Sequence, residues 1–226
     1  MARRRLYLMR HAEVAYFDER GRPLPPDGVP LTDAGRRQAE QARAALAGVR
    51  FDRVLSSGLP RSVETARLVA GPTATVEAWP ELREIAPGRL DAIPEGELEA
   101  AFLQVFRGVV PGATRFLGGE SVDALFDRVL PALDRLVADP SWDTALAVLH
   151  GGVNRALLSF ALSGRRQLFG GMEQAPACLN VLDLGAGGDW VVRAVNVSPG
   201  DPAHLAGRST TMEQLWAQFR GGRDGA

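Results

Sequence analysis

The sequence contains no lysine and a single cysteine, Cys178, and these two absences exclude several kinds of chemistry. All 26 basic residues are arginine. Schiff-base catalysis and a lysine-dependent phosphate-binding loop are therefore excluded. One cysteine can form neither an intramolecular disulfide nor a cysteine-cluster metal site. Cys178 lies in an apolar segment, so we expect it to be a buried, unreactive thiol.

Long apolar runs are also missing. Arg3–Arg5 is followed by only four apolar residues before Arg10, whereas a signal peptide needs about 7–15. No segment approaches the roughly 20 apolar residues of a membrane span. The net charge is −1, so no overall field attracts nucleic acid or an anionic membrane. We therefore expect a cytoplasmic protein that binds neither nucleic acid nor a membrane.

The remaining composition is that of one globular domain. A chain of 226 residues, 46% of them hydrophobic, can bury a sizeable core, and we predict a single domain over residues 1–226. Strand and helix patterns alternate along it. The predicted strands are 6–9, 53–55, 73–77, 145–149, 178–184 and 190–196. The predicted helices are 32–47 with Thr32 as N-cap, 60–70, 98–106, 122–137 with a kink or restart at Pro131, and 151–162.

This alternation predicts an α/β fold with a mostly parallel sheet covered on both faces. The turn Gly185–Asp189 between the last two strands is typical of a β-hairpin, which makes those strands antiparallel to each other. The segment at about 86–119 is rich in glycine and proline. We predict that it is a lid-like insertion.

Potentially reactive side chains follow two of the predicted strands. The first strand ends in Arg10-His11, and the strand 145–149 ends in His150. The turn after 53–55 leads into a helix whose first turn contains Arg61. Because the carboxyl ends of parallel strands meet at one edge of a sheet, we expect these four residues to converge. Two arginines, two histidines and helix N-termini would form a cationic pocket of phosphate size.

Such a pocket is suited to phosphoryl transfer. A neutral imidazole can attack phosphorus, while arginines and a second histidine stabilise the phosphoryl oxygens. The leaving oxygen needs a proton from a carboxylic acid. The candidates for that acid are Glu13, Glu81, Glu84 and Glu120. The third histidine, His204, is expected to be an ordinary surface residue.

Five segments in order resemble the histidine phosphatase superfamily, also called phosphoglycerate mutase-like, from Leu6 to about Leu205. They are Leu8-Met-Arg-His-Ala-Glu13, Ser56-Ser-Gly-Leu-Pro-Arg-Ser-Val-Glu-Thr-Ala66, Leu82-Arg-Glu84 with Gly88-Arg89, Gly118-Gly-Glu-Ser121, and Leu149-His-Gly-Gly-Val153.

The resemblance implies a three-layer α/β/α sandwich with a six-stranded sheet, one strand of which, near the C-terminus, is antiparallel. It implies that His11 is the phosphorylated nucleophile and that Arg10, Arg61 and His150 bind the phosphoryl group. Glu84 would be the general acid and later the base that activates water. Glu13 and Glu120 would be substrate-pocket or phosphate-binding residues. No metal and no organic cofactor are implied.

Some positions depart from the superfamily pattern. Val14 and Phe17 stand where many members have threonine and a phosphate-binding asparagine, and the segment after Glu84 lacks the usual aromatic-Glu-Gly. The apolar residues Val14, Phe17 and Ile85, with the helix 98–106, suggest a phosphoester with an apolar or bulky body.

Three functions are compatible with the sequence. The first is a phosphomonoester phosphatase that acts through phosphohistidine on a small phosphorylated metabolite. The second is a phosphoglycerate mutase-type phosphotransferase. Val14 and Phe17 count against it, and so does the separation of only 66 positions from Glu84 to His150, because the mutases have a longer basic insertion there. The third is a non-catalytic phospho-ligand binding module, although His11 and Glu84 are both present. The edge hairpin is also compatible with a homodimer.

Overall fold

The computed structural model of the protein describes residues 3–18, 22–205 and 207–224. Its strands are β1 (Arg4–Arg10), β2 (Arg53–Ser56), β3 (Val76–Ala78), β4 (Val109–Val110), β5 (Thr144–Leu149), β6 (Leu168–Phe169), β7 (Leu179–Leu184) and β8 (Trp190–Val197). Its α-helices are α1 (Asp33–Ala45), α2 (Pro60–Ala70), α3 (Glu95–Leu103), α4 (Val122–Ala138), α5 (Gly151–Ser163) and α6 (Thr211–Asp224). Three short 3₁₀ helices are η1 (Pro80–Leu82), η2 (Leu90–Ala92) and η3 (Phe116–Gly118).

Six strands form one sheet in the order β3-β2-β5-β1-β7-β8. β1 and β2 both pair in parallel with β5, and β3 pairs in parallel with β2. β7 is antiparallel to both of its neighbours, β1 and β8. The predicted α/β fold, with a mostly parallel six-stranded sheet and one antiparallel strand near the C-terminus, is confirmed. A separate small sheet pairs β4 with β6.

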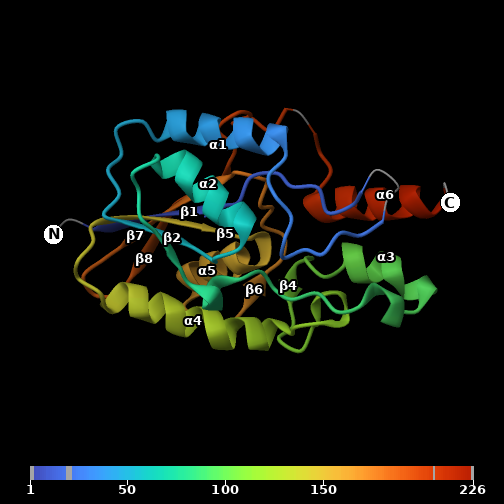
Figure 1. Ribbon diagram of the computed structural model, residues 1–226. Coiled ribbons are helices and arrows are strands. Elements are labelled where there is room, and N and C mark those ends of the chain that lie inside the picture. The colour runs from blue at the N-terminus through green and yellow to red at the C-terminus, as the bar shows by residue number, and fades with distance from the viewer. Residues whose placement is uncertain (1–2, 19–21, 206, 225–226) are drawn as a thin grey trace.

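Helices cover both faces of the six-stranded sheet (Figure 1). Along β5, Ala145, Ala147 and Leu149 belong to the core shared with α4 and α5, whereas Leu146 and Val148 belong to the core shared with α1 and α2. This alternation follows from the two-residue period of a strand, and both faces are apolar because both are covered.

Local sequence signals explain where the helices begin. The Thr32 hydroxyl accepts a hydrogen bond from the Gly35 amide, so Thr32 is the predicted N-cap of α1. Pro60 occupies the first turn of α2, where its missing amide hydrogen costs nothing. α4 continues through Pro131, so the predicted restart of the helix there is wrong.

Several predicted boundaries differ from the structure, and the largest shifts are of three residues, such as the end of α3 at Leu103 instead of residue 106. The third strand begins at Val76 instead of residue 73. α3 begins at Glu95 instead of residue 98, because the first turn after Pro94 contains two acidic residues and no apolar stripe, although acidic residues favour a helix N-terminus.

The C-terminal helix α6 was not predicted. It lies beside α3 at the end of the molecule that is opposite the N-terminus (Figure 1). Phe219 of α6 is buried against Leu98 and Phe102 of α3, and Met212, Leu215 and Trp216 pack around them. The predicted insertion 86–119 is therefore anchored to the C-terminal helix through an apolar cluster. No helix among the described residues is both long and apolar enough to cross a membrane.

Candidate active site

His11 and His150 meet at the carboxyl edge of the sheet. His11 directly follows β1 and His150 directly follows β5, and these two strands are hydrogen-bonded neighbours. The His11 amide donates to the Leu149 carbonyl at 2.9 Å, and the two imidazole centroids are 5.1 Å apart. Both rings are almost fully buried, with exposed fractions of 2% and 0%. The predicted convergence of the two histidines is therefore present.

The hydrogen bonds of His11 define its tautomer. Nδ1 lies 2.7 Å from the Ala12 carbonyl oxygen, to which it can only donate. The lone pair is then on Nε2, where the Arg61 Nε–H donates at 3.3 Å. The Tyr16 hydroxyl oxygen lies 3.5 Å from the same Nε2. Nε2 therefore carries the free lone pair of the ring, and two donors face it.

Burial and the two neighbouring arginines hold His11 in its neutral form. Desolvation lowers the pKa of His11 well below 6.5, and the charges of Arg10 and Arg61 lower it further, against a smaller opposing effect of the Ala12 carbonyl. The lone pair of Nε2 is thus available at neutral pH, as a nucleophile requires.

His150 has a similar electrostatic environment. Its pKa is lowered well below 6.5, mainly by burial and then by His11, Arg61 and Arg10. Nε2 of His150 is hydrogen-bonded to the Ser57 hydroxyl at 2.7 Å. Within the described part of the chain, Nδ1 of His150 and Nε of Arg10 are buried without a hydrogen-bond partner. Phosphoryl oxygens are acceptors that could satisfy such polar atoms.

The two predicted phosphate-binding arginines already donate to acceptors of the protein itself. Nη1 of Arg61 donates to the Pro26 carbonyl at 2.5 Å. Nη1 of Arg10 donates to the Gln174 carbonyl at 2.5 Å and to the Thr211 hydroxyl, at the start of α6, at 2.9 Å. These contacts hold both guanidinium groups in place beside the histidines.

The Glu84 carboxylate lies over the N-terminus of α5. Its oxygens accept from the Gly152 amide at 3.1 and 3.2 Å, and Oε1 also accepts from the Ile85 amide at 2.9 Å. A Cβ atom on Gly151 would be 3.7 Å from Oε2 of Glu84 and 3.8 Å from Nε of Arg10, so the carboxylate and that guanidinium flank the same backbone atom. Glu84 is therefore near the predicted phosphate site.

The other three candidate acids have different partners. Glu81 pairs with Arg135 at the surface. Oε1 of Glu13 accepts from the Thr32 hydroxyl at 2.8 Å. Within the described residues, neither carboxylate is hydrogen-bonded to His11 or His150. The predicted substrate-pocket role of Glu13 stays a prediction.

Glu120 acts on the segment that holds Glu84. It accepts from the Ala86 amide and pairs with Arg128, whose guanidinium donates to the carbonyls of Glu81, Arg83 and Glu84. Glu120 and Arg128 thereby fix the backbone around Glu84. The predicted contact of Glu120 with substrate stays a prediction.

Residues suggested as an apolar substrate surface are partly buried elsewhere. Ile85 is 1% exposed and belongs to the core. Phe17 packs against Phe219 of α6, with ring centroids 6.3 Å apart. Cys178 is buried, as predicted, and burial raises its pKa to about 12, which makes it an unreactive thiol. His204 is exposed.

Sequence reasoning missed three contributors to the cluster. Tyr16 gave only a weak signal, because a tyrosine five residues after His11 has no fixed spacing rule. Ser57 belongs to a quoted motif but was not singled out. Thr211 could not be connected with Arg10, because the two are 201 positions apart and α6 was not predicted.

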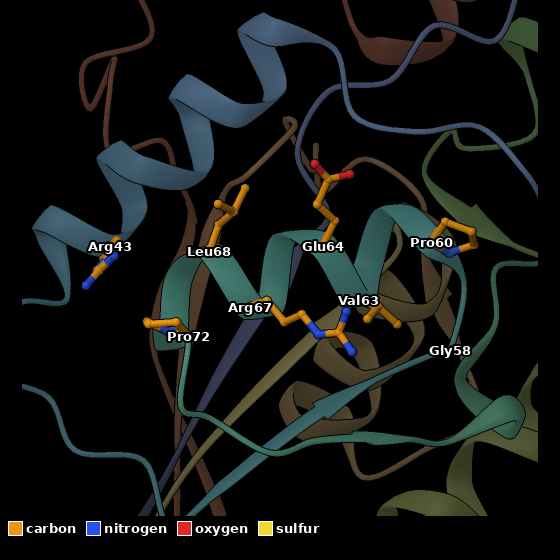
Figure 2. A pocket seen from close by; sticks show the side chains of 8 residues that line it. All are labelled: Arg43, Gly58, Pro60, Val63, Glu64, Arg67, Leu68 and Pro72. Carbon is orange, nitrogen blue, oxygen red and sulfur yellow. The ribbon is translucent and has the colours of Figure 1, made fainter.

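A surface pocket of about 840 Å³ lies along α2, away from the paired histidines. Figure 2 shows its lining, which comes from α1, α2 and the flanking turns: Arg43, Gly58, Pro60, Val63, Glu64, Arg67, Leu68 and Pro72. None of the predicted site residues lines it. We assign no role to this pocket.

Two buried, neutral histidines and two arginines meet at the edge of the parallel sheet. This arrangement belongs to the class of histidine-dependent phosphoryl-transfer sites. Residues 6–198 match the family model described as "Histidine phosphatase superfamily (branch 1)". The chain belongs to this superfamily.

Three proteins that are similar to this chain illustrate the range of names among its relatives. Phosphoglycerate mutase-like protein 4 of Arabidopsis thaliana is 29% identical over 88% of this chain and 86% of its own length. The α-ribazole phosphatase of Shigella flexneri is 26% identical, with a TM-score of 0.63 over 85% of this chain and 96% of that chain. A mycobacterial glucosyl-3-phosphoglycerate phosphatase is 25% identical, with a TM-score of 0.69 over 86% and 99%.

Proposed function

We propose that this protein is a metal-independent phosphomonoester phosphatase that acts through a phosphohistidine intermediate on a small phosphorylated metabolite. The observation that carries the proposal is the state of His11. Its Nδ1 donates to a backbone carbonyl, its Nε2 retains the lone pair, and its pKa is lowered by burial beside two arginines. A neutral, oriented imidazole in a cationic pocket is what an attack on phosphorus needs.

In the first half-reaction, Nε2 of His11 attacks phosphorus, and the bond from phosphorus to the leaving oxygen breaks. The electron pair of that bond goes to the leaving oxygen, which takes a proton from the carboxylic acid of Glu84. Arg10, Arg61 and His150 stabilise the phosphoryl oxygens as charge moves onto them.

In the second half-reaction, the Glu84 carboxylate takes a proton from a water molecule that attacks the phosphohistidine. The bond between nitrogen and phosphorus breaks, its electron pair returns to Nε2, and inorganic phosphate leaves. Glu84 is again protonated, so one residue serves as acid and then as base.

A mutase-type phosphotransferase is the alternative function. The Arabidopsis relative has a mutase-like name, whereas the two structural relatives are named as phosphatases. The phosphatase is favoured by the short separation of 66 positions from Glu84 to His150 and by the residues Val14 and Phe17. The relatives act on different substrates by name, so the proposal does not extend to one metabolite. A cytoplasmic location and a small-molecule partner stay predictions.

The test is hydrolysis of p-nitrophenyl phosphate with and without chelator, comparing the wild-type protein with His11→Ala. We expect chelator-insensitive hydrolysis by the wild type and none by the variant. A folded wild type that does not hydrolyse p-nitrophenyl phosphate but interconverts phosphoglycerates would favour the mutase. Activity that survives in His11→Ala would overturn the proposed nucleophile.

A further inference from the structure

Tyr16 follows the nucleophile by five residues and is held close to it. Its carbonyl accepts from the Leu24 amide at 2.8 Å, which holds the backbone at Tyr16 in place. The guanidinium of Arg61 lies 5.9 Å from the centroid of the tyrosine ring. The hydroxyl oxygen lies 3.5 Å from Nε2 of His11, a long contact for a hydrogen bond. Tyr16, Arg61 and His11 therefore meet at the nucleophilic atom.

We propose that the Tyr16 hydroxyl donates a hydrogen bond to the phosphoryl group while that group is bound to His11, an inference that rests on the proposed phosphatase function. Tyr16 would be a phosphoryl-binding catalytic residue in addition to Arg10, Arg61 and His150.

The valence of Nε2 carries this inference. In the free enzyme, the single lone pair of Nε2 faces two donors, Nε–H of Arg61 and O–H of Tyr16. When the bond between nitrogen and phosphorus forms, that lone pair is consumed. Both donors then need a new acceptor, and the cost of lacking one is large for the buried Arg61 and smaller for the half-buried Tyr16. The nearest new acceptors are the oxygens of the phosphoryl group on Nε2.

The environment of Tyr16 keeps its hydroxyl a donor. Burial raises the pKa of Tyr16 above its usual value, and the smaller effects of Arg61 and Arg10, which lower it, do not cancel that rise. The negative charge of the Glu84 carboxylate also raises the pKa of Tyr16. The phenol therefore stays protonated near neutral pH and faces the same charged groups as the nucleophile.

The chain provides a matched control, because its only other tyrosine is Tyr7. Tyr7 lies within β1, and its ring contacts Phe51 edge-on, with centroids 5.8 Å apart. Tyr16→Phe and Tyr7→Phe each remove one hydroxyl and keep the ring. Thermal unfolding of both variants checks that each is folded before activity is compared.

For Tyr16→Phe we expect kcat/KM for p-nitrophenyl phosphate to fall about 10- to 100-fold, since a hydrogen bond to a charged group is lost. The inhibition constant of orthovanadate should rise by a similar factor, because vanadate occupies the phosphoryl position. Tyr7→Phe should change neither quantity more than about twofold. Equal kcat/KM and equal vanadate inhibition for Tyr16→Phe and the wild type would overturn the inference while the phosphatase function stood.

Failure of the proposed function itself would look different. If the wild type hydrolyses no phosphomonoester, calorimetry with vanadate still compares wild type and Tyr16→Phe. Weaker vanadate binding by Tyr16→Phe would support the tyrosine contact in a binding protein. Unchanged binding, or no binding by either protein, would overturn the role of Tyr16.

Discussion

Replacement of Gly152 by alanine should displace the Glu84 carboxylate without altering the nucleophile. A Cβ atom at residue 152 would lie 2.8 Å from Oε1 of Glu84 and 2.9 Å from Cγ2 of Ile85. Both distances are well below van der Waals contact. Ile85 is 1% exposed and is packed in the core, so the carboxylate is the group that can move more easily.

The size of the effect follows from that clash. The contact must open by about 0.5–1 Å, and a misplacement of about 1 Å at a reacting group costs on the order of 100-fold in rate. A general acid contributes about 10²- to 10⁴-fold, so partial loss of Glu84 falls within the same range. Overpacking should lower the free energy of unfolding by about 1–3 kcal/mol, which leaves the protein folded.

The choice of leaving group makes the assay specific for the acid. Nitrophenolate is a stable anion and leaves with little protonation, whereas an alkoxide needs a proton in the transition state. We therefore expect Gly152→Ala to reduce kcat/KM, which reports the first half-reaction, about 100-fold for an alkyl phosphomonoester and much less for p-nitrophenyl phosphate. The kcat values should fall for both substrates, because the attack of water on the phosphohistidine also uses Glu84. Glu84→Gln should show the same dependence on the leaving group.

Gly171→Ala is the matched control, because a Cβ atom at residue 171 would have no heavy atom within 4 Å. It should leave both substrates unaffected. If Gly152→Ala lowered kcat/KM equally for both substrates, the variant would act through the phosphate site and not through the acid. If it retained full activity on the alkyl ester, the proposed position of Glu84 would be wrong.

Three further predictions concern protonation, hydrogen bonding and packing. Because the pKa values of His11 and His150 are lowered in the folded protein, the unfolded chain binds more protons once the pH falls below about 6.5. The urea concentration at the unfolding midpoint should therefore decrease as the pH is lowered from about 7.5 to about 5.5. The decrease should be smaller in His11→Gln, whereas His204→Gln should behave as the wild type. Ser57→Ala leaves Nε2 of His150 without its partner, so chemical denaturation should show that the free energy of unfolding falls by about 1–3 kcal/mol. Calorimetry should also show weaker phosphate binding. Unchanged values for both would contradict the role of this hydrogen bond. Phe219→Ala should lower the free energy of unfolding by about 3 kcal/mol, and hydrogen exchange should locate the loss in α3 and α6; unaltered protection of these helices would refute the packing argument.

The sequence predicted the sheet and the position of the two histidines well, because both depend on short-range patterns. A continuous apolar run such as Ala145–Leu149 is typical of a strand covered on both faces, and the residue that follows such a strand emerges at the carboxyl edge. The N-cap at Thr32 and the helix start at Pro60 are equally local signals.

The sequence could not predict contacts that depend on distant segments. Nothing local to Arg10 shows that its guanidinium meets the start of α6, and nothing local to Glu120 shows that its carboxylate pairs with Arg128. Helix α6 itself was readable, because Met212, Leu215, Trp216 and Phe219 follow the helical i, i+3, i+4, i+7 spacing. Nothing in the sequence, however, indicates that α6 packs against α3.

Tyr16 belongs to an intermediate case. The sequence places it near the nucleophile, but only the fixed loop after β1 brings its hydroxyl to Nε2 of His11. Sequence spacing can thus indicate which residues are close to a site, whereas side-chain direction in a loop depends on the packing of that loop.

The charges that lower the pKa values of the two histidines are also those that would bind the phosphoryl group. Arg10 and Arg61 lower both pKa values in the absence of an anion. A bound phosphate dianion opposes their field, so binding should raise the pKa of His150 and make its protonated form, with two N–H donors, more stable. His11 would be neutral before the encounter, and the protonated form of His150 would become more populated after it, although both rings are buried at the same edge of the sheet. An upward shift of the His150 titration on adding phosphate, followed by NMR, would support this coupling, and an unshifted titration would contradict it.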